Sequence, residues 1–107
     1  MKRHKLEEMT KGWFIGDFVP TLHLTRDFEV GVKYYRAGDR EDAHVHRIAT
    51  EYTVIVTGKV RMGQQIYQSG DIVVIAPGES TDFEAITDAA TTVVKLPSLQ
   101  GDKYAAA

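Results

Sequence analysis

Between residues 28 and 97 the sequence is a succession of short β-strand patterns separated by turn signals. The run TEYTVIVTG at 50–58 is dense in β-branched residues and tyrosine, which favour strands, and it stops at glycine. Further short runs follow at 64–68, 72–76, 81–87 and 90–97. No interior stretch has the period of a long amphipathic helix. Regular short strands of this kind predict an all-β fold, a single-domain antiparallel barrel or sandwich.

The segment FEVGVKYY at 28–35 shows the two-residue period of a strand. Phe28 and Tyr34 fall on one face with two valines between them, whereas Glu29 and Lys33 fall on the other face. We therefore expect the barrel to begin with this strand.

The two ends of the chain differ from this β-rich middle. Residues 2–11 mix basic residues with two glutamates and predict one short, charged helix. We divide the chain into an N-terminal extension with the first strands at 1–27, the barrel at 28–97 and a C-terminal tail at 98–107. The tail is polar, so we expect it to be loosely held, and residues 105–107 are interpreted as a cloning scar.

The length of 107 residues is that of one domain. The formal net charge of −2 gives no electrostatic reason to expect nucleic acid or an anionic membrane as a partner. The chain has no cysteine, so disulfides and thiolate metal sites are excluded. No apolar run approaches the length of a membrane span, and residues 1–9 lack the apolar core of a secretory signal. We therefore expect a cytoplasmic protein.

The segment HVHRIATEYTVIVTG at 44–58 holds the residues most suited to chemistry. His44 and His46 are two residues apart, so on a strand both imidazoles point to one face. Glu51 follows His46 by five residues, and a turn at 47–50 before a new strand would bring its carboxylate to the same interior. Two imidazoles and one carboxylate are a common ligand set for transition metals, non-haem iron among them. The alternative is a pair of surface histidines beside a turn.

The spacing in this segment resembles the first motif of the cupins. The matching residues are Gly38, His44, His46, Glu51 and Gly58. The second cupin motif is matched in part by GDIVVIAPGESTDFEA at 70–85. The resemblance covers about residues 28–97 and implies an RmlC-like jelly-roll barrel with a metal site inside it.

The resemblance also implies a divalent transition metal, Fe, Mn, Ni or Zn, held by His44, His46 and Glu51. The sequence departs from the cupin pattern at Thr81, where the motif is expected to supply a fourth ligand. A threonine hydroxyl is a weak ligand beside an imidazole. Water, substrate or Thr81 would complete the set, and the alternative is that Thr81 donates a hydrogen bond next to the metal.

Other polar residues are weaker candidates for the site. Arg47 and Arg61 offer bidentate donors for an anionic substrate, and Tyr52 carries a hydroxyl suited to a pocket wall. The alternative for each is an ordinary surface residue. His23 alternates with two leucines, and we expect it to be an exposed strand histidine rather than a further ligand.

Two classes of function remain open from the sequence. The first is a metal-dependent enzyme, an oxygenase or isomerase of a small polar metabolite, in which Glu51 holds the metal and carries a proton. The second is a non-catalytic module that senses or sequesters a small molecule, with a weakly bound metal or none. A purely structural dimer would leave buried histidines and a glutamate unexplained. In each case we expect a homodimer that pairs through exposed edges near residues 13–20.

Overall fold

The computed structural model describes residues 1–106, which form one short 3₁₀ turn and ten β-strands. In chain order the elements are η1 (Leu6–Glu8), β1 (Trp13–Ile15), β2 (Glu29–Tyr35), β3 (Arg40–Val45), β4 (Thr50–Thr57), β5 (Lys59–Met62), β6 (Gln65–Gln68), β7 (Ile72–Ile75), β8 (Ser80–Ala85), β9 (Ala89–Leu96) and β10 (Tyr104–Ala105). The all-β fold predicted from the sequence is confirmed. None of the described residues belongs to a helix long and apolar enough to cross a membrane.

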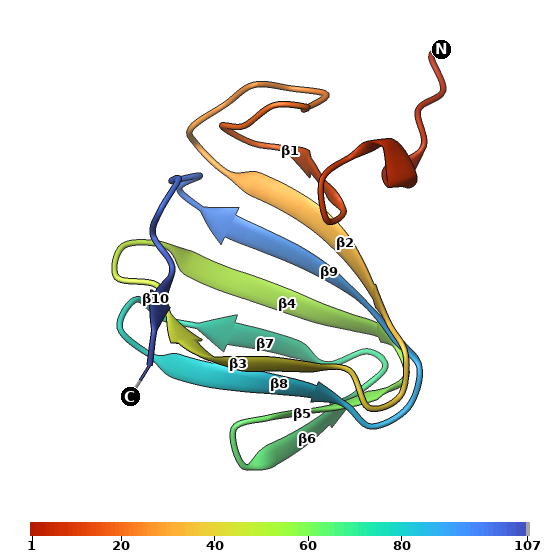
Figure 1. Cartoon of the computed structure of the whole chain (residues 1–107), viewed down its shortest axis with the longest axis vertical. Coiled ribbons are helices and arrows are strands. Elements are labelled where there is room, and N and C mark those ends of the chain that lie inside the picture. Colours follow the sequence, from red (N-terminus) through yellow and green to blue (C-terminus); the bar gives the residue numbers. More distant parts are fainter. Residues whose placement is uncertain (107) are drawn as a thin grey trace.

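The strands form two five-stranded antiparallel sheets that face each other (Figure 1). One sheet has the order β1-β2-β9-β4-β7, and the other has the order β10-β3-β8-β5-β6. From β2 to β5 each successive strand lies in the opposite sheet, and the same alternation returns from β6 to β9. This winding confirms the predicted jelly-roll barrel.

The hydrophobic core lies between the sheets at one end of the barrel. Inward-facing residues from five strands form it: Ile55, Val60, Met62, Ile75, Phe83, Ala85 and Ala89. Alternation along β4 explains the division between inside and outside, because Thr53 and Ile55 are buried whereas Val56 is exposed. The opposite end of the same strands carries polar side chains.

The strand β2 turns its more polar face inward. Glu29 is buried and Tyr35 packs against the core, whereas Tyr34 is exposed. The period predicted at 28–35 is therefore confirmed, and the inner face is the one that carries Glu29 and Lys33. Periodicity alone does not assign the inner face, and here it borders a polar cavity that accepts charged groups.

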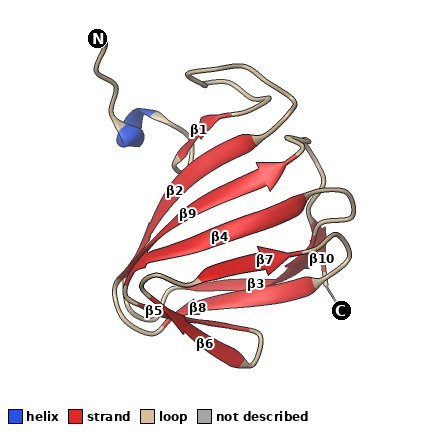
Figure 2. Ribbon diagram, turned by 180° about the vertical axis from the view of Figure 1, so that it is seen from behind, coloured by secondary structure: helices blue, strands red, loops and turns tan. Residues whose placement is uncertain are grey.

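Of the short helix or extension predicted at 2–11, the structure shows only the three-residue 3₁₀ turn η1. Lys5, which precedes the turn, makes no side-chain capping hydrogen bond, and no residue of the turn is buried. A short helix without a cap or a packed face does not overcome the unfavourable free energy of nucleation. The turn lies outside the barrel, beside β2 (Figure 2).

The C-terminal tail is packed rather than loosely held. Ser98 and Asp102 are buried, and the Ser98 hydroxyl donates a hydrogen bond of 3.1 Å to the Glu29 carboxylate. The strand β10 pairs with β3, with Ala105 opposite His44. Residues 105 and 106, interpreted from the sequence as part of a cloning scar, thus contact β3, and residue 107 lies outside the described residues.

Candidate metal centre

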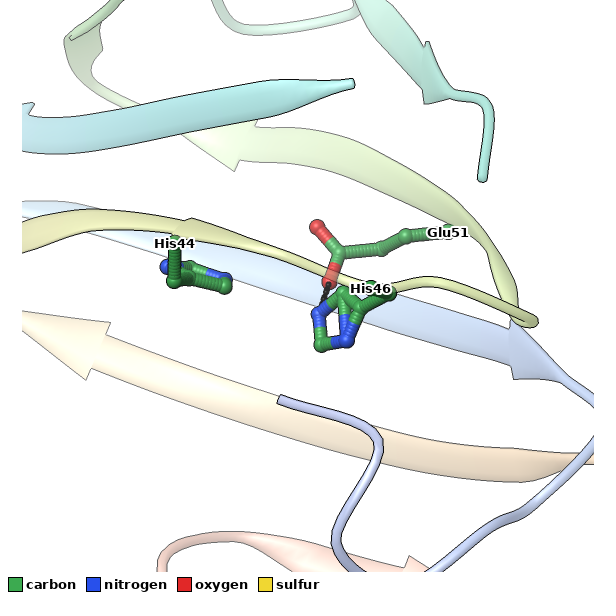
Figure 3. Close-up of side chains that lie close together, drawn as sticks. All are labelled: His44, His46 and Glu51. Atoms are coloured by element: carbon green, nitrogen blue, oxygen red, sulfur yellow. Dashed lines mark ion pairs between the residues drawn. The ribbon is translucent and has the colours of Figure 1, made fainter. Parts of the chain in front are cut away.

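The structure brings His44, His46 and Glu51 together (Figure 3). His44 is near the end of β3, His46 lies just after that strand, and Glu51 begins β4 after a loop at 46–49. One ligand atom from each side chain lies within 4.8 Å of the other two. The turn expected at 47–50 is the feature that places the carboxylate beside the imidazoles.

Asp102 of the C-terminal tail holds this loop in place. Its carboxylate accepts hydrogen bonds from the backbone N–H groups of Arg47, Ile48 and Ala49, at 3.0, 3.2 and 2.9 Å. Burial raises the pKa of Asp102, but these three donors outweigh burial and leave its pKa below the ordinary value. The sequence analysis missed this residue, which lies 56 positions beyond His46.

The imidazole of His46 is oriented by the same segment. Its Nδ1 lies 2.8 Å from the backbone carbonyl oxygen of Asp102. A carbonyl oxygen only accepts, so Nδ1 carries the proton and Nε2 presents a lone pair. Burial, followed by repulsion from Lys95 and His44, lowers the pKa of His46 to about 4, so the ring is neutral at pH 7.

The Nε2 lone pair of His46 faces a carboxylate oxygen. The distance from Nε2 to Oε1 of Glu51 is 3.7 Å, and both side chains are largely buried. With His46 neutral, two electron-pair donors face each other with no proton between them, so the contact is not an ion pair. A cation between them would convert this unfavourable contact into a favourable one.

The other two ligand side chains are oriented in a similar way. The Nδ1 atom of His44 lies 3.2 Å from the carbonyl oxygen of Asp42, which leaves Nε2 as its ligand atom. The hydroxyl of Thr53 donates a hydrogen bond of 2.9 Å to Oε2 of Glu51, which leaves Oε1 toward His46. Each ligand therefore has an outer partner that fixes its orientation, as in known metal sites.

The three side chains fit a single transition-metal ion. Such ions bind nitrogen and oxygen at about 2.0–2.2 Å, so two ligands of one ion lie at most about 4.4 Å apart. The three ligand atoms all lie within 4.8 Å of one another, which is close to this limit. Among the described residues, this is the single group of three or more such side chains that could hold an ion.

Thr81 lies close to the metal centre but is engaged elsewhere. It pairs with His44 across β3 and β8, and it lines the cavity that lies beside the candidate metal ligands. Its hydroxyl donates a hydrogen bond of 2.9 Å to the carbonyl oxygen of Asp82. The role of Thr81 as a fourth ligand or as a hydrogen-bond donor stays a prediction.

The structure does not bring Arg47, Arg61 or Tyr52 to the cavity. The guanidinium of Arg47 lies over the Tyr104 ring, with 3.9 Å from Cζ to the ring centroid. Arg61 donates two hydrogen bonds to Asp82, at 3.1 and 3.0 Å, and further ones to Glu84 and to the Gly63 carbonyl oxygen, so most of its donors are already used. Tyr52 follows the inward-facing Glu51 by one residue and is 37% exposed on the outer face of β4. His23 is exposed, as expected, and is not part of the cavity wall.

A cavity of about 280 Å³ opens beside the ligands. His44, Glu51 and Thr81 line one side of it. The remaining wall includes Trp13 and four lysines, namely Lys11, Lys33, Lys95 and Lys103. These lysines were not predicted from the sequence. Strand periodicity places Lys33 on the same face as Glu29, but it does not reveal that this face is the inner one.

A second hollow is larger but lacks this chemistry. It is an open groove of about 790 Å³ between η1 and β2, lined by residues such as Leu6, Met9, Val32 and Tyr34. None of the three metal-ligand side chains lines this groove. The smaller cavity is therefore the candidate site, because it is partly enclosed and both His44 and Glu51 line it.

Comparison with protein-family models and with curated proteins gives no match. Among solved structures, an uncharacterized Klebsiella pneumoniae protein with a double-stranded β-helix domain shares 22% identity, with a TM-score of 0.70 over 76% of this chain and 72% of that chain. An RmlC-like cupin from Shewanella frigidimarina shares 14% identity, with a TM-score of 0.63 over 72% of this chain and 71% of that chain.

A third similar structure is a sugar phosphate isomerase of the cupin superfamily from Silicibacter pomeroyi. It shares 20% identity, with a TM-score of 0.61 over 65% of this chain and 50% of that chain. At such identities the three likenesses establish the fold, and they agree with the two facing sheets. The protein therefore has the cupin fold, the double-stranded β-helix of these structures.

Proposed function

We propose that the protein binds one divalent transition-metal ion through His44, His46 and Glu51 and uses it to act on a small polar metabolite. The observation that carries this proposal is the contact between the Nε2 lone pair of His46 and Oε1 of Glu51. Two buried acceptors held face to face are explained by a cation that both of them bind. Fe, Mn, Ni and Zn all suit two imidazoles and one carboxylate.

The ion would supply Lewis acidity at a position open to the cavity. The chain's own residues supply orientation and proton transfer. Asp102 fixes the ring of His46, and Thr53 fixes the carboxylate of Glu51. Glu51 also lines the cavity, so its carboxylate is placed to accept a proton from a bound ligand.

An isomerase or an oxygenase is the class of enzyme that we propose. Isomerisation is supported by the similar cupin described as a sugar phosphate isomerase and by the presence of a carboxylate suited to proton transfer. Oxygenation is supported by the ligand set, because two histidines and one carboxylate are typical of non-haem iron oxygenases.

A non-catalytic binding module is the second candidate function. It is favoured by Thr81, since a neutral hydroxyl that already donates to Asp82 adds little to metal affinity. Such a module would bind the metabolite in the same cavity and release it unchanged.

The metal centre is tested by metal analysis of protein purified without a histidine tag. We expect about one ion per chain in the wild type, loss of the ion in His46→Ala and an unchanged content in His23→Ala, whose imidazole is exposed and remote from the cavity. Equal metal content in the three proteins, or none in the wild type after incubation with each metal, would overturn the proposal. Oxygen uptake by the Fe(II) form and product analysis with a metabolite panel then separate an enzyme from a binding module.

A homodimer and a cytoplasmic location stay predictions. The expected interface near residues 13–20 includes Trp13, which also lines the cavity. The outer face of the β1-β2-β9-β4-β7 sheet supports self-association better, because it exposes Tyr34, Val56, Ile72 and Val74. Light scattering on the purified protein measures the oligomeric state directly.

A further inference from the structure

The cavity wall away from the metal ligands is positively charged. Lys33 and Lys95 reach it from the inner faces of β2 and β9 and are partly buried, whereas Lys11 and Lys103 are exposed. A small, partly enclosed space lined by ammonium groups concentrates positive potential. A neutral ligand would gain nothing from such a wall.

Lys33 is the ammonium group most in need of a partner. Burial lowers its pKa, attraction by Glu41 acts the other way, and Lys103, Lys11 and Lys95 lower it further. Among the described residues, no carboxylate lies within ion-pair distance of the Lys33 ammonium. A buried charge without a pair is unfavourable unless a ligand supplies the opposite charge.

Trp13 separates and positions the two inner lysines. The ammonium groups of Lys33 and Lys95 lie 4.8 and 5.2 Å from the centroid of its ring. The ring rests on Gly31, where a Cβ atom would come within 2.7 Å of Cε3 of the indole. Only glycine at position 31 leaves room for this ring, which gives the cavity an apolar surface between two cations.

The acidic groups of the cavity are already engaged. Glu41 accepts a hydrogen bond from the Tyr35 hydroxyl, Asp82 pairs with Arg61, and Glu51 belongs to the metal centre. Outside the lining, Glu29 pairs with Lys95 at 3.5 Å. This pairing leaves Lys33 as the inner cation that a ligand can neutralise.

A buried hydroxyl also lacks a partner in this cavity. Thr91 is 1% exposed and lines the cavity, and among the described residues its Oγ1 atom makes no hydrogen bond of good geometry, although the Tyr35 hydroxyl lies beside it. Thr91 pairs with Lys33 across β9 and β2, so the hydroxyl and the unpaired ammonium lie on neighbouring strands. Buried polar groups in native proteins are generally satisfied, so this pair indicates a ligand with polar oxygen atoms.

We propose that the ligand of this cavity is a small organic acid whose carboxylate binds Lys33 and whose carbon chain lies on Trp13. This inference rests on the proposed function, because a further oxygen of the acid would face the metal centre. A single unpaired inner lysine suits one negative charge, and about 280 Å³ admits only a short acid. Lys11 and Lys103 at the exposed side would attract the anion over a longer range.

The test uses Trp13, the single tryptophan of the chain, as an internal fluorescence probe. Glycolate, lactate and 3-hydroxybutyrate are titrated into the protein, each beside its uncharged amide, with and without bound Co(II). We expect at least one acid to change the fluorescence saturably and its amide to bind about tenfold more weakly or worse, because the amide loses the hydrogen bond between opposite charges. Lys33→Met should lower the affinity for that acid by a similar factor. Lys59→Met, which changes an exposed lysine of β5, should leave the affinity unchanged.

Two results would overturn the inference. One is equal binding of each acid and its amide, and the other is an unchanged affinity in Lys33→Met while circular dichroism shows a native fold. The absorption spectrum of bound Co(II) reports the metal centre separately from Trp13. If Co(II) fails to bind while an acid still titrates with Lys33-dependent affinity, the proposed metal centre is wrong and the carboxylate site stands.

Discussion

The two ends of the barrel are built on the same strands and have opposite chemistry. At the apolar end, Ile55 of β4 and Ala89 of β9 are buried in a closed core. At the polar end, Glu51 of β4 lies opposite Lys95 of β9, next to the histidines and the cavity. Glu51 and Ile55 are only four positions apart along β4. Position along an inward-facing strand, rather than strand identity, therefore decides whether a side chain serves stability or binding.

The two ends also differ in whether their side chains have the hydrogen-bond and ion-pair partners that they need. The apolar end holds hydrocarbon groups that need no partner, and it supplies the hydrophobic stabilisation of the fold. The polar end holds a lone pair facing a carboxylate. The adjoining cavity holds the Lys33 ammonium and the Thr91 hydroxyl, which lack partners among the described residues and lie in register with Ile55, where the cavity meets the core. Each of these groups costs free energy in the free protein, and each would be relieved by a metal ion or an anion.

The sharpest test of the apolar end is Ile55→Ala. Because Ile55 is completely buried, we expect a loss of about 2–5 kcal/mol in the free energy of unfolding. The matched control is Ile72→Ala, which removes the same atoms from a side chain that is 63% exposed and should change stability by about 0.5 kcal/mol or less. Urea denaturation measures both. Equal losses in the two variants would contradict the assignment of the core.

The polar end should respond to Asp102→Ala in two ways. Three backbone N–H groups lose their acceptor, so we expect a loss of about 3 kcal/mol in the free energy of unfolding. Metal affinity should also fall about 10- to 100-fold, because the loop that carries His46 is released. Asp39→Ala, which removes one exposed carboxylate–backbone hydrogen bond, should leave metal affinity unchanged. Wild-type metal affinity in Asp102→Ala would show that the tail does not position the imidazole.

The lowered pKa of Asp102 predicts how the stability of the protein changes at acid pH. Its pKa is lowered in the folded protein, so its stabilising contribution is complete above the ordinary pKa of 3.8 and is lost as the pH falls through the lower folded value. Thermal unfolding of the wild type and of Asp102→Asn between pH 6 and pH 2 checks this. The difference in stability should shrink only below about pH 4. A difference that stays constant over the whole range would refute the assignment of the charge.

The smallest expected effect is that of Thr91→Val. Replacing the unpaired hydroxyl by a methyl group of similar size removes an unsatisfied polar atom, so we expect the ligand-free protein to gain about 1 kcal/mol of stability. Thr53→Val, in which the lost hydroxyl donates to Glu51, should instead destabilise the protein. Differential scanning calorimetry compares the two. A loss of stability in Thr91→Val would mean that its hydroxyl has a partner.

Local patterns and the cupin resemblance were enough to predict the fold and the cluster of His44, His46 and Glu51. Runs of β-branched residues between turn signals identify the strands, and the spacing of His44, His46 and Glu51 is itself local. A turn between the second histidine and the glutamate was the only tertiary assumption that the ligand set required. It was correct because β3 and β4 are consecutive in the chain and the loop at 46–49 is short.

Contacts distant in sequence were beyond the reach of those patterns. Asp102 meets the loop at 46–49 only after the whole barrel has formed, and nothing in SLQGDKY distinguishes it from a surface aspartate. Arg61 looked like an anion-binding residue, but cross-strand pairing with Asp82 uses its donors. Strand periodicity places Lys33 on the face opposite to Phe28 and Tyr34, but it does not reveal which face is inside.

The most direct test of the central claim is an anomalous difference map from crystals of the protein soaked in Co(II). The account predicts one strong peak at about 2.0–2.2 Å from Nε2 of His44, Nε2 of His46 and Oε1 of Glu51, with open positions toward the cavity. The account would be contradicted by a map in which those three atoms surround no peak while cobalt binds only at exposed carboxylates.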